Sequence, residues 1–371
     1  MKKRTFFFIL GIACTLLFGS ALAAPGDADD PLISLNFLNK TFTASIDKSA
    51  DESLDRSDKM LSDGANAQWQ KILAAAEASV GTDYTATFQE VRIKQDDILS
   101  GPTGLQIILL AGSMKVEFSS GAVVDVTAGK EVASGSTLSA DHRYLVAEDT
   151  AALFFVTSKT AVADYCGAYS LTSSARTDYN AMAEALKILH LFRGSGSGYG
   201  QGFDLERTPT RAEALVMLIR LLGEEDAALA CTGTHPFRDV DAWAAPYVAY
   251  AYEKGYSNGV SSDQFGSTMN ASAQMYTEFI LRALGYSSTA QTDISDALTR
   301  AQSCGAITAG ECAAFSDGTF LRADVVYLSY YALDVSLSGA QQTLGDKLAQ
   351  RGVFTPSELF QAHHLVTSAR L

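Results

Sequence analysis

The chain has 371 residues, of which 47% are apolar and 19% charged, and its formal net charge is −14. The length predicts two or three domains, and the apolar content excludes a disordered or fibrous chain because it is sufficient to build cores. The acidity disfavours nucleic acid and anionic membrane surfaces as partners, so an anionic partner would need a local cluster of cations.

Residues 1–23 have the pattern of a secretory signal peptide. Lys2, Lys3 and Arg4 form a basic start, residues 6–18 are apolar, and residues 21–23 match a small-x-small cleavage site. An uncleaved membrane anchor is the alternative. No later segment has 18 uninterrupted apolar residues, so the mature chain is expected to lack a transmembrane segment. We expect a secreted protein, or one held at the cell wall or cell surface by binding.

Residues 24–83 are predicted to be helical, and residues 84–171 to form a small β-rich domain. Charges alternate in sign over residues 47–63, which indicates a solvated helix face. Short β-rich runs then follow between glycines spaced about eight residues apart, at residues 105–110, 114–118, 122–126, 144–146 and 152–157. This spacing predicts a sandwich or barrel, whose role as a ligand pocket or a structural element stays open.

The β-rich pattern faintly resembles the cupins, but the residues for a cupin metal site are missing. His142 is the only histidine in the segment, and no His-x-His or CxxC pair occurs, so no metal or other cofactor is expected. Cys304 and Cys312 are close enough in sequence to form a disulfide, or they stay as free thiols. The Gly/Ser-rich residues 194–202 match no phosphate-binding motif and are predicted to form a surface loop.

From residue 178 the chain is predicted to be helical and to repeat. The three helix–loop–helix units span residues 178–232, 233–290 and 291–355, with a tail at 356–371. The second helix of the units starts at TRAE (210–213), SAQM (272–275) and LRAD (321–324), at offsets of 62 and 49 residues. One unit cannot bury its apolar face alone, whereas three packed together can. Four residues of the first unit are predicted core: Leu215, Leu218, Ile219 and Leu222.

The candidate binding residues lie at the start of the second helix in the units. Thr210 and Glu213 form a capping box, which places Arg211 at the first helical position, and Arg322 has the same place in the third unit. A cation there opposes the helix dipole at a cost of about 0.3–1 kcal/mol. Beside free N–H groups, such an arginine is a candidate anion-binding corner; a salt bridge to a neighbouring unit is an equally weighted alternative.

The repeats resemble S-layer homology (SLH) modules of Gram-positive-type bacteria. The matching segments are HPFRDVDAW (235–243), YVAYAYEKGYSNGV (247–260), Phe265-Gly266 and TRAE (210–213). The resemblance implies three modules in a pseudo-threefold helical bundle. It also implies noncovalent anchoring to secondary cell-wall polysaccharide, often a pyruvylated amino sugar, with the motif arginine at the sugar. Arg211 matches this motif fully and Arg322 partly, while Ala273 replaces the arginine in the second unit.

Together these observations predict a multidomain α+β protein: a helical segment, a small all-β domain and an all-α bundle of three SLH-like repeats. The polysaccharide-binding residues are expected to be Arg211, Arg322, Thr210, Glu213 and Asp324. Trp243 is expected to pack between modules, and Asp239 to fix the helix that follows it. An extracellular scaffold or ligand-binding protein with degenerate, non-binding SLH repeats is the alternative. A wall hydrolase is disfavoured, because no recognisable catalytic constellation is present, so no enzyme is expected.

Overall fold

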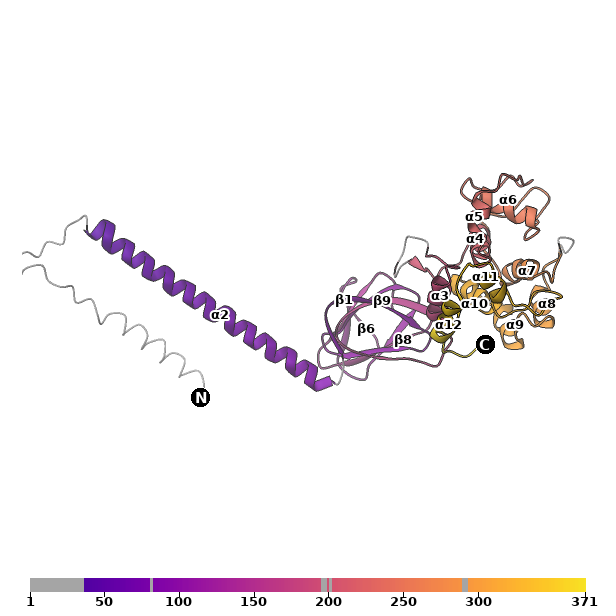
Figure 1. The fold of residues 1–371 in the computed structure, drawn as a ribbon. Coiled ribbons are helices and arrows are strands. Elements are labelled where there is room, and N and C mark those ends of the chain that lie inside the picture. The colour runs from indigo at the N-terminus through magenta and orange to yellow at the C-terminus, as the bar shows by residue number, and fades with distance from the viewer. Residues whose placement is uncertain (1–36, 81–82, 195–198, 200–201, 289–292) are drawn as a thin grey trace, which may run out of the picture. The chain divides into compact units, whose positions relative to one another are not determined.

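The computed structural model describes residues 37–80, 83–194, 199, 202–288 and 293–371. A long helix comes first, an antiparallel β-sheet follows, and the remainder is helical (Figure 1). This order confirms the mixed α+β class expected from the sequence. The predicted signal peptide and most of the Gly/Ser-rich loop lie outside the described residues.

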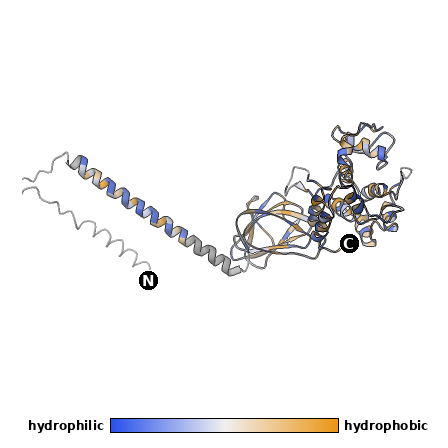
Figure 2. Cartoon of the chain, in the orientation of Figure 1, coloured by the Kyte–Doolittle hydropathy of each residue, from blue (hydrophilic) through white to orange (hydrophobic). Residues whose placement is uncertain are grey.

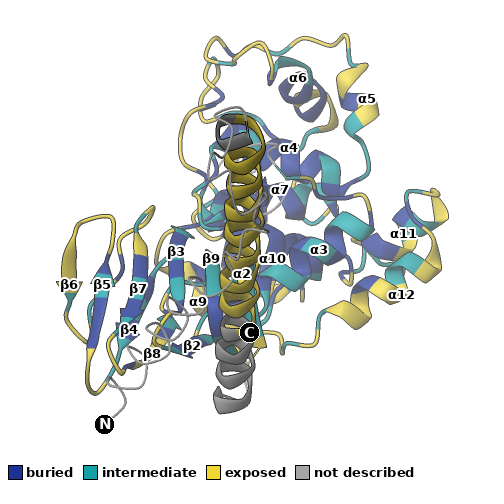
Figure 3. Ribbon diagram, turned by 90° about the vertical axis from the view of Figure 1, so that its left-hand side faces the viewer, coloured by how far each residue is buried: buried dark blue, intermediate teal, exposed yellow. Residues whose placement is uncertain are grey.

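The N-terminal helical segment is a π-helical turn, η1 (Phe37–Phe42), followed by α2 (Thr43–Val80). Every side chain described in residues 40–67 is exposed (Figure 3), and hydrophilic residues alternate with hydrophobic ones along this stretch (Figure 2). Lys48 and Glu52 form an i,i+4 ion pair of 3.9 Å, which stabilises such a helix by a few tenths of a kcal/mol. The solvated face predicted from the charge pattern is therefore confirmed.

Nine antiparallel strands form one curled sheet in the order β4-β8-β2-β9-β3-β7-β5-β6, with β1 paired to β9. The strand bounds are β1 Asp83–Lys94, β2 Ile98–Pro102, β3 Gln106–Ala111, β4 Met114–Glu117, β5 Ala122–Asp125, β6 Lys130–Val132, β7 Arg143–Ala147, β8 Ala151–Val156 and β9 Thr160–Thr172. The long strand β9 pairs with β1, β2 and β3, so it joins the two halves of the sheet.

The interior of the sheet is built from alternating residues, as the period of a half-buried strand requires. Ile107, Leu109 and Phe154 are completely buried, while their sequence neighbours are more exposed. The five strands predicted from the sequence are confirmed as β3, β4, β5, β7 and β8. The sequence analysis missed β1, β2, β6 and β9. In β1 the reason is visible, because residues 86–90 are exposed and largely polar and therefore carry no apolar alternation.

The rest of the chain is helical. The helices are α3 Tyr179–Ile188, α4 Arg211–Leu221, α5 Glu225–Leu229, α6 Ala245–Lys254, α7 Ala273–Ala283, α8 Ala297–Ser303, α9 Ala309–Ser316, α10 Arg322–Ala332, α11 Leu344–Gln350 and α12 Pro356–Leu365. The helices predicted to precede each apolar helix are present as α3, α6 and α8. The segment predicted to be a C-terminal tail, residues 356–371, contains α12, which packs against α3.

The first helix of each unit ends in the same way. His190, Gly255 and Gly305 adopt left-handed backbone conformations directly after α3, α6 and α8, or one residue later, with φ of 63°, 75° and 77°. The residue that follows each of them donates a backbone hydrogen bond to the carbonyl five residues back, as in a Schellman motif. The three units thus share a local geometry as well as a sequence pattern.

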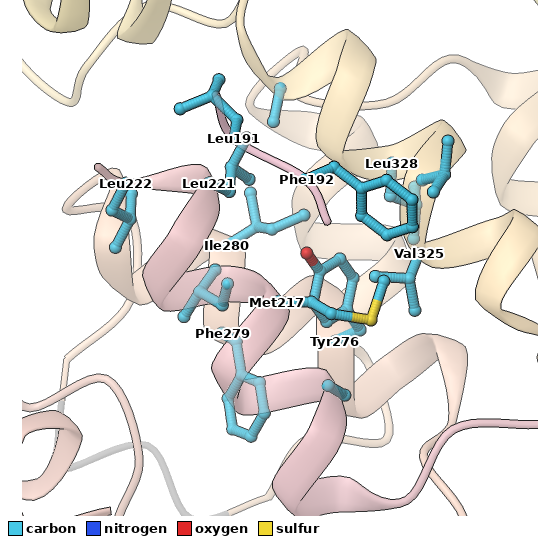
Figure 4. Close-up of a cluster of buried hydrophobic side chains, with 14 of the residues drawn as sticks. Leu191, Phe192, Met217, Leu221, Leu222, Tyr276, Phe279, Ile280, Val325 and Leu328 are labelled. Carbon is cyan, nitrogen blue, oxygen red and sulfur yellow. The ribbon is translucent and has the colours of Figure 1, made fainter. Parts of the chain in front are cut away.

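The second helices of the units, α4, α7 and α10, pack on one another and form the centre of the helical core. Met217 of α4, Tyr276 and Ile280 of α7, and Val325 and Leu328 of α10 meet there (Figure 4). The four residues of the first unit predicted to be core are all buried, and Gly223 and Gly285 follow α4 and α7 with positive φ.

Candidate anion-binding groove

The first turn of α4 is held by the capping box that the sequence predicts. Thr210 Oγ1 accepts from the backbone N–H of Glu213 at 3.2 Å, and Glu213 Oε2 accepts from the backbone N–H of Thr210 at 2.8 Å. The Glu213 carboxylate also accepts two hydrogen bonds from Arg207, each 2.9 Å long. Thr210 and Glu213 are therefore engaged in the cap, and neither lines the groove described below.

Backbone contacts then seat α4 against the second unit. The N–H of Arg211 donates to the carbonyl of Met269 at 2.7 Å, and the N–H of Ala212 donates to the carbonyl of Ser267 at 3.3 Å. The first N–H groups of a helix have no partner within the helix, and two of those of α4 are hydrogen-bonded in this way. The Arg211 side chain is consequently directed toward the loop and helix of the second unit.

The Arg211 guanidinium is buried without a counterion. The residue is 4% exposed, its Nη2 donates to Ser257 Oγ at 3.0 Å, and its Cζ lies 5.0 Å from the ring centres of both Phe265 and Phe279. Among the described residues, no carboxylate lies within ion-pair distance, and the buried Nε has no hydrogen-bond partner. Burial, followed by the positive charge of Arg282, lowers the pKa of Arg211 to about 10, although the negative charge of Asp239 opposes that shift.

Arg211 lines a groove of about 450 Å³ between the start of α4 and the second unit, a volume suited to a small ligand. The lining residues are Arg211, Asn258, Gly259, Val260, Ser261, Ser262, Met275, Glu278, Phe279, Arg282 and Ile294. Gly259 has φ of 80°, and a Cβ at this position would lie 2.3 Å from the Phe237 ring, so the wall of the groove requires glycine here.

Asp239 holds the loop beside this groove rather than the helix that follows it, so the expectation for this residue was wrong. Its Oδ1 and Oδ2 accept from the backbone N–H groups of Phe265 and Gly266, both at 2.7 Å. Burial raises the pKa of Asp239, but these backbone hydrogen bonds outweigh it, and the net shift is downward. The residue thereby positions the Phe265 ring beneath Arg211.

Arg322 occupies the corresponding place between the third and first units. It is 5% exposed, and its Nε donates to the carbonyl of Phe203 at 3.0 Å. Its Nη1 lies 3.5 Å from Met217 Sδ, and Phe192 lies under the guanidinium at 5.6 Å. Within the described part of the chain it has no ion pair, and burial, followed by the charge of Arg207, lowers its pKa. The predicted salt-bridge alternative is therefore not seen at either arginine.

The junction between the second and third units differs, because Ala273 begins α7 there. A smaller cavity of about 110 Å³ lies at this junction. The positively charged side chain that lines it is Lys159, from the turn between β8 and β9. Lys159 Nζ pairs with Asp324 Oδ1 at 2.5 Å, and Asp324 is 1% exposed. Burial raises the pKa of Asp324, although the Lys159 charge opposes that shift. The Asp324 carboxylate is thus engaged with the β-sheet.

Three further expectations have structural outcomes. Trp243, which is expected to pack between modules, is 52% exposed, so it is not fully buried. Cys304 and Cys312 are free thiols, as are Cys166 and Cys231. Among the described helices, none combines the length and the apolarity needed to cross a membrane.

Comparisons with known proteins add little. No protein-family model and no curated protein matches this chain. Among solved structures, it is similar to procruciferin, an 11S globulin from Brassica napus, with 13% identity and a TM-score of 0.16. The similarity covers 26% of this chain and 26% of procruciferin, and it carries no argument about fold or function.

Proposed function

We propose that this chain is a secreted cell-envelope protein. It anchors noncovalently to acidic, pyruvylated secondary cell-wall polysaccharide through three SLH-like repeats in a pseudo-threefold bundle. The sequence resemblance supports this proposal, as does the contact of α4, α7 and α10 at one centre. The first backbone N–H groups of α4 donate to a loop of the second unit, and those of α10 donate to a loop of the first unit. Contacts of this kind, from each unit to another, are expected in a pseudo-threefold bundle.

The observation that carries the proposal is the buried, uncompensated guanidinium of Arg211 at a groove. A buried cation without an ion-pair partner is unfavourable, and burial accordingly lowers the pKa of Arg211. A carboxylate placed in the groove would supply the missing counterion and a partner for the Arg211 guanidinium. Val260, Phe279 and Ile294 would contact the apolar faces of the sugar or its substituent.

An extracellular scaffold with degenerate repeats is the second candidate, and the junction at Ala273 favours it. There the chain supplies its own ion pair, Lys159 with Asp324, and a wall ligand would have to displace it. In that case the buried arginines would only hold the units together.

A cosedimentation assay separates the two candidates. The full chain is mixed with purified bacterial cell wall before and after chemical removal of pyruvate, alongside the variants Arg211→Met and Arg176→Met. We expect retention on native wall, loss on treated wall and loss for Arg211→Met. Arg176→Met is the control, because its partner Asp96 is exposed and far from the groove in sequence. Equal retention of all proteins on both walls would contradict anchoring through pyruvate.

A further inference from the structure

A second arginine lines the same groove as Arg211. Arg282 lies in the last turn of α7, and its side chain is 6% exposed. Its positive charge contributes to the lowered pKa of Arg211, so the two guanidinium groups act on each other across the groove. We infer that Arg282 is a second anion-contacting residue for an acidic saccharide and that Glu278 sets how much of its charge the ligand meets. This inference rests on the proposed function.

Glu278 is a carboxylate shared between two cations. Its Oε1 accepts from Arg282 Nε and from Ser287 Oγ, and its Oε2 accepts from Arg300 Nη2, each at 2.7 Å. The Glu278 side chain is 3% exposed. One negative charge therefore faces two guanidinium groups, although Arg300 has a further partner in Asp296 at 2.8 Å. Arg282 is thus held in position by a carboxylate that it shares with Arg300.

The charge of the groove follows from this network. Among the described residues, the charged ones that line it are Arg211, Arg282 and Glu278, so this lining carries a net +1 in a chain of −14. Arg300 shares the Glu278 carboxylate and has Asp296 as a second partner, so this pair adds no net charge beside the groove. A saccharide carboxylate seated beside Arg211 would therefore also be attracted by Arg282, and affinity would depend on the charge of both arginines.

The first unit contains a matched position that does not line the groove. Arg220 lies 62 residues before Arg282, and its Nε donates to Glu225 Oε1 at 2.8 Å. When Arg220 is replaced, Glu225 retains Tyr247 and Arg193 as partners. When Arg282 is replaced, Glu278 similarly retains Arg300 and Ser287. Arg220→Gln and Arg282→Gln therefore remove comparable ion pairs, one away from the groove and one within it.

The test is calorimetric titration of the full chain with a glycoside of a pyruvylated amino sugar and with its uncharged methyl ester. We expect Arg282→Gln to weaken binding of the acid about tenfold, the loss of one charge-assisted contact. Glu278→Gln should tighten it several-fold, because one neutralising charge is removed. Arg220→Gln should match the unaltered protein. Arg282→Lys, which keeps the charge, should lose less affinity than Arg282→Gln and tests the same point if Glu278→Gln does not fold.

Opposite signs for Arg282→Gln and Glu278→Gln distinguish this role from a structural ion pair, which predicts that both weaken binding. Equal affinities of Arg282→Gln and Arg220→Gln would overturn the inference. Its failure differs from failure of the proposed function: if Arg211→Met loses binding while Arg282→Gln does not, only the role of Arg282 is wrong. If the unaltered chain binds neither glycoside, anchoring itself is wrong.

Discussion

Arg211 and Glu311 are both buried charges in the helical region, but among the described residues Glu311 alone of the two has an ion-pair partner. Glu311 is completely buried, and its carboxylate pairs with Arg370 at 2.6 and 2.9 Å and accepts from the Tyr327 hydroxyl at 2.7 Å. Arg211 is almost as buried, but the described residues offer it a serine hydroxyl and two aromatic rings instead of a carboxylate. The comparison teaches that a compensated buried charge belongs to the fold, whereas an uncompensated one beside a groove is available to a ligand.

The largest expected effect comes from removing the partner of Glu311. Arg370→Met leaves a buried carboxylate without its cation, which should lower the free energy of unfolding by about 3–5 kcal/mol. Urea unfolding followed by circular dichroism measures this loss. Arg176→Met is the control, because its pair with Asp96 is exposed and should contribute less than about 1 kcal/mol. Similar losses in the two variants would break the distinction between the sites.

The Lys159–Asp324 pair should show an intermediate effect with a pH signature. The pKa of Asp324 is raised by burial in the folded state, so the folded chain holds this proton more tightly than the unfolded chain. The free energy of unfolding should therefore fall as pH rises from the ordinary aspartate pKa through the raised one. Lys159→Met should enlarge that fall by about 1–3 kcal/mol, because the Lys159 charge opposes the shift.

Asp324→Asn is the matched variant for this titration, since it removes the ionisable group. Urea unfolding between about pH 4 and 8 should show the fall in the unaltered chain and not in Asp324→Asn. Parallel pH profiles for the two proteins would show that Asp324 is not titrating with a raised pKa.

The smallest expected effect is a gain in stability, whereas Arg370→Met should cause a loss. Lowering the pKa of Arg211 to about 10 corresponds to a cost of about 3 kcal/mol, which the two aromatic rings offset by about 1–2 kcal/mol. Arg211→Met should therefore stabilise the ligand-free protein by about 1 kcal/mol at neutral pH, and the gain should shrink above about pH 10 as the guanidinium deprotonates. Thermal unfolding without ligand measures it, and a lower Tm for the variant would indicate a structural arginine.

Much of the local structure could be predicted from the sequence, because its determinants lie within four residues of one another. The Thr210–Glu213 capping box, the place of Arg211 and Arg322 at helix starts, and the glycines that end α4 and α7 are all of this kind. The apolar strands β3, β4, β5, β7 and β8 are likewise predictable from short β-rich runs between regularly spaced glycines. The short helices α5, α9 and α11 are not predicted, because so few residues give little apolar periodicity.

The candidate site itself depends on contacts between distant residues. Arg211 and Ser257 are 46 residues apart, and Lys159 and Asp324 are 165 apart. The sequence marks Arg211 as unusual, since a cation at a helix start opposes the dipole. It does not indicate whether a carboxylate from another unit neutralises that cation, nor that Arg282 lines the same groove. Whether Arg211 is neutralised and whether Arg282 lies beside it depend on which loop contacts the start of α4. The packing of the three units determines that contact.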